Sequence, residues 1–146
     1  KSGCLYIIIR TAWLYSGYGH NFVKTISRLA SERDELNVVN DQWGTPTYAG
    51  DLAEAIISIM ERDDLPELEG VYHFTNEGAC TWYDFAKEIV AFTGANCKVN
   101  PVTTEEYPSK VKRPAYSILD KTKIKETFDL EIRDWREALK SCMATF

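Results

Sequence analysis

The sequence predicts an α/β fold with some parallel strand pairing, with α+β as the alternative, and two observations support this. Short apolar runs alternate with amphipathic runs along the chain, as in folds built from strands and connecting helices. The first apolar run, "LYIII" at residues 5–9, is continuous and rich in β-branched residues. Such a run is typical of a strand covered on both faces, which is the usual environment in a parallel sheet.

A helix and a second strand are predicted after a loop that contains two glycines. Residues 21–33 place Phe22, Ile26 and Leu29 at helical spacing, which predicts an amphipathic helix. "LNVVN", at residues 36–40, then indicates a short strand.

Residues 48–62 predict a second helix of about four turns. Thr47 is its candidate N-cap, and Asp51 lies in the first turn, where a negative charge suits the helix dipole. The apolar spacing predicts that four side chains of this helix face the core: Leu52, Ile56, Ile59 and Met60.

The clearest helix covers residues 81–94 and follows an alternating segment, residues 71–76, that predicts a strand. Thr81 is the expected N-cap, with Asp84 three residues later as its acidic capping partner. Gly94 is the expected end of this helix, because glycine readily adopts the left-handed conformation there.

The last part of the chain combines a strand, an irregular segment and two helices. "KVNPV", at residues 98–102, indicates a short strand, and residues 103–120 show no clear periodicity. The closing helices are predicted over residues 121–128 and 133–143.

The composition excludes several classes of function. The chain has 146 residues, enough for one domain, and 12% of them are aromatic, which argues against disorder. A formal net charge of −5 without a basic stripe argues against nucleic acid as the main partner. No apolar run approaches the roughly 20 residues of a membrane span, so we expect no membrane partner.

The cysteines and histidines point to neither a disulfide framework nor a metal site. Four scattered cysteines form no C-x-x-C pair, and the two histidines have no ligand partner at metal-binding spacing. We expect these cysteines to pack as small, reduced apolar residues, as in a cytoplasmic protein: Cys4, Cys80, Cys97 and Cys142.

The standard catalytic and phosphate-binding motifs are absent from the sequence. It contains no G-x-G-x-x-G loop, no P-loop and no G-x-S-x-G elbow. Any site must therefore be built from the long loops. These loops carry aromatic residues and cover residues 11–21, 41–47 and 103–116.

Three loop residues suit a polar ligand that carries a ring. Trp13 follows the first predicted strand, at the end where α/β ligand sites gather, although core packing is an equal alternative. Gln42 can offer both a donor and an acceptor to a nucleobase edge. Gly44 would let the backbone approach a ligand closely.

Two further candidates suit an anionic group. Asn21, at the start of a helix, either caps that helix or contacts an anionic or sugar group. Arg113 lies in "KVKRPAYS", the most basic local stretch, and its guanidinium matches the geometry of a diphosphate. The alternative for Arg113 is a solvated surface arginine.

Five blocks of sequence carry a family resemblance. In chain order they are "RTAWLY" (10–15), "GHNFVKTI" (19–26), "DQWGTPT" (41–47), "YHFTNEGACTWYDFAKEI" (72–89) and "RPAYSILD" (113–120). Together they resemble the second half of the dTDP-4-dehydrorhamnose reductase family, which belongs to the extended short-chain dehydrogenases.

The resemblance implies the C-terminal part of a Rossmann-like enzyme, with the final sheet strands and a small α/β substrate-binding lobe. Residues 1–146 would then form a single partial domain. The whole enzyme would use NADH or NADPH to reduce the C4 ketone of dTDP-4-dehydro-L-rhamnose. The alternatives are another nucleotide-sugar epimerase or dehydratase of the superfamily, or a non-catalytic regulatory binding subunit.

The resemblance also implies that the catalytic and cofactor-binding parts lie in an N-terminal half that this chain lacks. The family's Tyr-x-x-x-Lys pair lies upstream of "RTAW". Tyr83 and Lys87 have that spacing but lie downstream, so we assign Tyr83 to packing. The chain alone is expected to be inactive and to bind no cofactor.

For the candidate residues, the resemblance implies that Gln42 and Gly44 face the substrate nucleotide and that Trp13 flanks the deoxysugar. A first strand without neighbours on one side would expose an edge that pairs with other copies. We therefore expect self-association through Tyr6 to Ile9, or a rearranged N-terminus.

Overall fold

The computed structural model describes residues 3–107, 111 and 113–145. Its strands are β1 (Ile7–Arg10), β2 (Leu14–Tyr15), β3 (Glu35–Val39), β4 (Trp43–Gly44), β5 (Thr47–Tyr48), β6 (Gly70–His73), β7 (Cys80–Thr81) and β8 (Lys98–Val102). Its α-helices are α1 (Phe22–Glu32), α2 (Ala49–Met60), α3 (Trp82–Thr93), α4 (Thr122–Phe128) and α5 (Trp135–Met143), and Leu65–Glu67 forms a short 3-10 turn.

The strands pair two by two, and most of the pairs are parallel. β1 pairs with β6, β2 with β5 and β3 with β8, all in parallel, while β4 and β7 are antiparallel. Parallel neighbours need a crossover connection, and helices lie between the paired strands in the sequence. The predicted α/β class with parallel pairing is confirmed.

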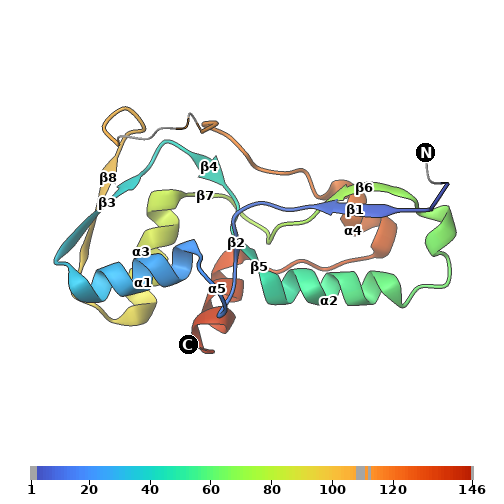
Figure 1. Cartoon of the computed structure of the whole chain (residues 1–146), viewed down its shortest axis with the longest axis horizontal. Helices are drawn as coiled ribbons and strands as arrows, with labels where there is room; N and C mark the ends of the chain where they lie inside the picture. Colours follow the sequence, from blue (N-terminus) through green and yellow to red (C-terminus); the bar gives the residue numbers. More distant parts are fainter. Residues whose placement is uncertain (1–2, 108–110, 112, 146) are drawn as a thin grey trace.

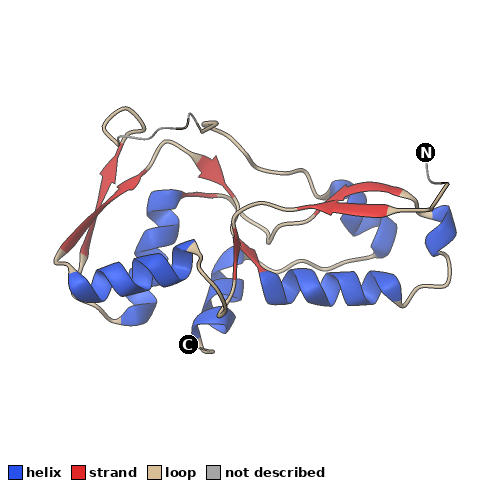
Figure 2. Ribbon diagram, viewed as in Figure 1, coloured by secondary structure: helices blue, strands red, loops and turns tan. Residues whose placement is uncertain are grey.

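The apolar residues form two separate cores. Figure 1 shows β3, β8, α1 and α3 at one end of the molecule, β1, β6, α2 and α4 at the other, and α5 between them. The helices α1 and α3 lie on the same side of the β3–β8 pair (Figure 2). The first core includes Val23, Ile26, Phe85, Ile89, Trp135 and Leu139. The second is built on Ala55, Ile59, Tyr72, Phe74, Ile124 and Phe128.

A polar network joins the segments that run between these cores. The Asn76 side chain is fully buried; its oxygen accepts the backbone N–H of Tyr48 at 2.8 Å, and its Nδ2 donates to Asp51 at 2.6 Å. Arg133 also donates to both carboxylate oxygens of Asp51, at 2.6 and 2.9 Å. These bonds connect the start of α2 to the segment that follows β6 and to the segment that precedes α5.

The predicted ends of α3 are confirmed. Thr81 and Asp84 form a reciprocal capping box, in which each side chain accepts the backbone N–H of the other residue. Gly94 closes the helix in the left-handed conformation, with φ of 67°. These signals are local in sequence, which explains why they were readable without the tertiary structure.

Thr47 does not cap α2, contrary to the sequence prediction. The residue lies in β5 and is fully buried, and its hydroxyl donates to the carbonyl of Ala12 at 2.7 Å. The N-cap position belongs to Tyr48, whose side chain makes no capping bond. Pairing between β5 and β2 draws Thr47 away from the helix end.

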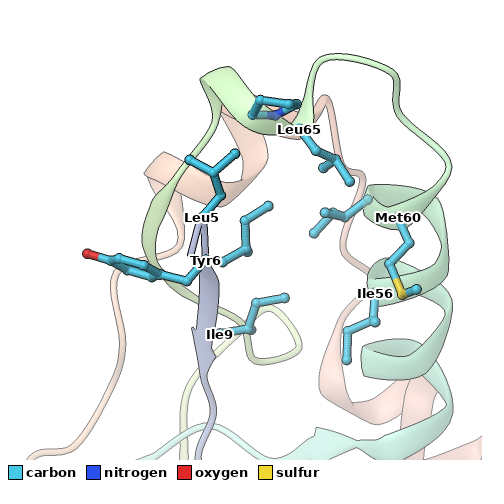
Figure 3. Close-up of a pocket in the computed structure, with 9 residues that line it drawn as sticks. Leu5, Tyr6, Ile9, Ile56, Met60 and Leu65 are labelled. Carbon is cyan, nitrogen blue, oxygen red and sulfur yellow. The ribbon is translucent and has the colours of Figure 1, made fainter. Parts of the chain in front are cut away.

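The predicted inward face of α2 is only partly buried. Ile59 is buried, but Ile56 is 37% and Met60 is 69% exposed. Both line an apolar groove of about 560 Å³ that α2 and the β1 region form with the turn at Leu65. Figure 3 shows Ile9, Ile56 and Met60 around this open space. The helical period correctly identified an apolar face, but the part of that face with Ile56 and Met60 is not covered by any described element.

Three of the four cysteines are buried as expected, whereas Cys4 is exposed. Burial, with a smaller contribution from Asp84, raises the pKa of the Cys80 thiol to about 12. Burial also raises the pKa of Cys142 to about 11, with nearby Asp51 acting in the same direction. Thiols with such pKa values carry little thiolate near neutral pH and are poor nucleophiles.

The described residues form neither a membrane-spanning helix nor a metal-binding cluster. None of the helices there combines the length and the apolar character needed to cross a bilayer. Those residues also contain no group of three or more His, Cys, Asp or Glu side chains able to hold a metal ion.

Candidate ligand-binding groove

A second groove, of about 840 Å³, lies at the end of the molecule that contains α1 and β3. Its polar and aromatic lining includes Phe22, Gln42, Trp82, Thr104, Tyr107 and Arg113. Two residues predicted from sequence, Gln42 and Arg113, thus meet in one groove although they are 71 positions apart. This groove is the candidate ligand site, because amide, guanidinium and indole groups converge there.

Strand β4 brings these two residues together. The N–H of Trp43 donates to the carbonyl of Ala115 at 2.8 Å, and the carbonyl of Trp43 accepts the N–H of Ser117 at 2.9 Å. On its other side, β4 pairs with β7. The "DQWG" segment therefore runs between β7 and the "RPAYS" segment, which places Arg113 near Gln42.

Gln42 is held by a polar cluster at the end of β3. Its side chain is only 7% exposed, and Nε2 donates to Thr104 Oγ1 at 3.0 Å. The Thr104 hydroxyl in turn donates to Asp41 Oδ1 at 2.6 Å, and the Thr104 N–H donates to Asp41 Oδ2 at 2.9 Å. These two bonds from Thr104 hold the pKa of Asp41 below its usual value, and the bond from the hydroxyl has the larger effect.

Trp13, Gly44 and Trp82 form a stacked unit beside the groove. The indoles of Trp13 and Trp82 stack with centroids 3.5 Å apart and an interplanar angle of 14°. A Cβ atom at Gly44 would lie 2.4 Å from the Trp13 ring, so the ring fills the space that glycine leaves. Of these three residues, Trp82 lines the groove, and Trp13 supports it from behind.

The backbone at Trp13 is strained, because its φ of 49° is uncommon for a residue other than glycine. Threonines hold the surrounding loops in place. Thr47 donates its N–H to the Trp13 carbonyl at 3.1 Å, and Thr45 donates its hydroxyl to the Gly78 carbonyl at 2.8 Å. Thr45 and Thr47 of "GTPT" are therefore buried residues whose hydrogen bonds connect neighbouring loops.

Asn21 acts as the N-cap of α1. Its Oδ1 accepts the backbone N–H of Lys24 at 3.1 Å. Its Nδ2 donates to the carbonyls of Ser16 and Tyr18, at 2.8 and 3.3 Å. The Asn21 amide is thus hydrogen-bonded within the protein, and of the two predicted roles it has that of a helix cap.

Arg113 is exposed at the edge of the groove. Among the described residues, no carboxylate pairs with its guanidinium. Lys110 and Lys112, which make "KVKRPAYS" the most basic stretch, lie outside the described residues. An unpaired guanidinium next to a groove is suited to an anionic ligand.

Tyr83 is confirmed as a packing residue. It lies against the first core, and the Lys87 ammonium sits 5.0 Å from the centre of its ring. The lysine therefore covers the tyrosine in a cation–π contact on one helix face.

Four of the polar and aromatic lining residues of the groove were not predicted from the sequence as site residues: Phe22, Trp82, Thr104 and Tyr107. Trp82 does carry a usable signal, because it is an aromatic residue directly after a helix N-cap at the end of a loop. Thr104 had no local signal, because its role depends on contacts with residues 62 and 63 positions away.

Parallel strand pairs and connecting helices define an α/β domain, and the groove that gathers amide, guanidinium and aromatic groups is its candidate ligand site. The family comparison is more specific. The chain belongs to the RmlD substrate binding domain family, whose model matches residues 1–146.

Similar proteins of known name support the same family. The chain is 47% identical to a dTDP-4-dehydrorhamnose reductase of Aggregatibacter actinomycetemcomitans, over 94% of this chain and 50% of that protein. It is 47% identical to the spore coat polysaccharide biosynthesis protein SpsK of Bacillus subtilis, over 91% and 45% of the respective chains. The chain therefore spans about half the length of the curated relatives it matches.

Among solved structures, the chain is similar to a dTDP-4-dehydrorhamnose reductase from Bacillus anthracis that was crystallised in complex with NADP. The TM-score is 0.89 at 40% identity, over 97% of this chain and 49% of that one. The likeness therefore extends across almost all of the present fold.

Proposed function

We propose that this chain is the substrate-binding part of an NAD(P)H-dependent reductase that converts dTDP-4-dehydro-L-rhamnose to dTDP-L-rhamnose. The observation that carries the proposal is the groove, which joins Gln42, Trp82 and Arg113 within a chain that matches the RmlD substrate binding domain along its whole length. The names of the similar reductases supply the reaction and the sugar. The same proposal places the protein in the cytoplasm.

In this proposal the groove holds the nucleotide part of the substrate. The Gln42 amide contacts the base edge, and the Arg113 guanidinium pairs with the diphosphate. Trp82 lies along the bound ligand, and Trp13, stacked on Trp82 and packed beside Gly44, supports it from outside the groove. Asn21 contributes by fixing the start of α1, which carries Phe22 into the groove.

The nicotinamide cofactor, when bound, supplies hydride to the sugar ketone. No residue of this chain is assigned to the cofactor, because the sequence has no glycine-rich nucleotide loop and Lys87 lies against the ring of Tyr83. The role of this chain is to bind and orient the ketosugar, and orientation by itself contributes much of a bimolecular rate enhancement.

Titration of the ¹⁵N-labelled chain with dTDP tests the binding role. We expect resonance shifts for Gln42 and Trp82, and we expect Arg113→Ala to weaken dTDP binding about tenfold through loss of a charge-assisted contact. Arg28→Ala is the matched control, because it removes an exposed arginine that pairs with Glu32 outside the groove. Unchanged spectra at saturating dTDP would refute the proposal.

The same preparation tests catalysis. Mixed with NADPH and the ketosugar, the chain should show no nicotinamide oxidation above background. Turnover by the chain alone would contradict the absence of a catalytic pair.

We also propose that the chain self-associates through the β1 edge and the apolar groove beside it. Within the described residues β1 has β6 as its only strand partner, so one edge leaves backbone N–H and C=O groups unpaired. Beside it, Leu5, Met60 and Ile56 are exposed on the groove. A second copy that adds its own strand would satisfy both features.

Light scattering with a matched pair of variants tests this self-association. Met60→Lys places a charge on the groove and should shift the chain toward monomer. Ile57→Lys is the control, because Ile57 also lies on α2 and is 56% exposed but does not line the groove. This substitution should leave the oligomeric state unchanged. A monodisperse monomer for the unmodified chain would refute the proposal.

A further inference from the structure

The orientation of the Gln42 carboxamide decides what the groove can recognise. One end of this amide is an acceptor and the other is a donor of two hydrogens. In the structure Nε2 is used by Thr104, whereas Oε1 has no hydrogen-bond partner among the described residues. Since Gln42 lines the groove, the open Oε1 is available to a bound ligand.

Thr104 can form a hydrogen bond with only one end of that amide. Its Oγ1 lies 2.6 Å from Asp41 Oδ1, and an ionised carboxylate can only accept, so the hydroxyl proton must lie on that bond. The second oxygen of Asp41 holds the Thr104 backbone N–H at 2.9 Å, which fixes the residue from both sides. Only lone pairs of Oγ1 remain for Gln42, and lone pairs attract the NH₂ end of the amide.

The charge on Asp41 is maintained at neutral pH. The bonds from Thr104 lower the pKa of the Asp41 carboxyl. The turn that carries Thr104 is itself held by Glu106, whose carboxylate accepts both the N–H and the hydroxyl of Thr103. The relay from Asp41 through Thr104 to Gln42 therefore has a definite direction, with each hydroxyl and amide proton assigned by its neighbour.

We propose that Thr104 is a positioning residue that turns the Gln42 carbonyl toward the groove, so that the site selects a ligand group with an N–H donor. The imide N3–H of a thymine or uracil ring is such a group, whereas the corresponding ring nitrogen of cytosine is an acceptor. This deepens the proposed function, on which its ligand rests, by assigning the contact that would distinguish the base.

The ligand-free part of the proposal is tested by NMR of the Gln42 side-chain NH₂ group. In the unmodified chain one of its protons should be shifted downfield by the bond to Thr104. Thr104→Val should remove that shift, and Thr104→Ser should restore it. Thr103→Val is the matched control, because it removes a hydroxyl of the same turn that bonds Glu106 and not Gln42. An NH₂ signal that Thr104→Val leaves unchanged would overturn the positioning role.

The ligand part is tested by calorimetry with dTDP and its N3-methyl analogue. We expect the unmodified chain to prefer dTDP by about tenfold or more, the cost of one unmade hydrogen bond to a buried group. Thr104→Val should bring the ratio close to one, and Thr104→Ser and Thr103→Val should preserve it. Equal binding of both ligands to the unmodified chain would overturn the assigned base contact while leaving the proposed function intact. Failure to bind either ligand would instead refute the proposed function, and the NMR result would still decide the role of Thr104.

Discussion

Gly44→Ala is expected to destabilise the chain by about 1–3 kcal/mol, because the added methyl group has no room. Its Cβ would lie 2.4 Å from the Trp13 ring. That ring cannot move freely, because it is already stacked on Trp82 with the two ring centroids 3.5 Å apart. The indole pair should separate, and the near-ultraviolet circular dichroism of the stacked rings should weaken. Chemical denaturation and this spectrum are the two measurements.

The Trp13→Ala background provides the control for this prediction. With the indole removed, the same methyl group at Gly44 should cost little, so the two substitutions should couple by more than about 1 kcal/mol. Equal costs in both backgrounds would show that Gly44 is needed for a reason other than the stack. Loss of dTDP affinity in Gly44→Ala alone would connect the stack to the groove.

Asn76→Ala is expected to cost about 2–4 kcal/mol of unfolding free energy. The asparagine is fully buried, and its removal leaves the N–H of Tyr48 without an acceptor. It also removes one of the two donors to Asp51 Oδ2, which then keeps only Arg133. Buried polar groups left unpaired cost about 1–3 kcal/mol each, and more when charged. Because these groups tie α2 to the segment before α5, the two cores should also unfold less cooperatively.

Asn100→Ala is the matched control for Asn76. Asn100 donates to Glu35 at 2.8 Å on the surface strand pair of β3 and β8, where water can replace the lost bond. Its cost should remain within about 0.5 kcal/mol. A similar loss at both positions would mean that the buried network does not carry the stability assigned to it.

The strongest sequence predictions concerned features encoded over a few neighbouring residues. The capping box of Thr81 and Asp84 and the left-handed Gly94 needed only the spacing of three residues and the conformational freedom of glycine. The longer strands were likewise recognisable from short apolar or alternating runs. The prediction that residues 5–9 form a strand covered on both faces was wrong, because alternate residues of β1 are exposed and Ile8 is 48% exposed. The ordered blocks from "RTAWLY" to "RPAYSILD" pointed to the family, and the match over residues 1–146 confirmed it.

The two-residue strands were not predictable. β2, β4, β5 and β7 are too short to carry a period, and they exist because a partner strand lies alongside. Thr47 illustrates the consequence. Its sequence position predicted a helix cap, but in the folded chain its hydroxyl donates to the carbonyl of Ala12 instead.

The sequence by itself determined the α/β class, the main helices with both caps of α3, and the residue types suited to a polar ligand that carries a ring and an anionic group. Only the tertiary structure decided which of those residues share a site. Gln42 and Arg113 meet because the backbone of Trp43 pairs with residues near position 116, and Gln42 is oriented by a threonine 62 residues away. Such contacts arise from chain folding over long separations, and neither periodicity nor propensity contains that information.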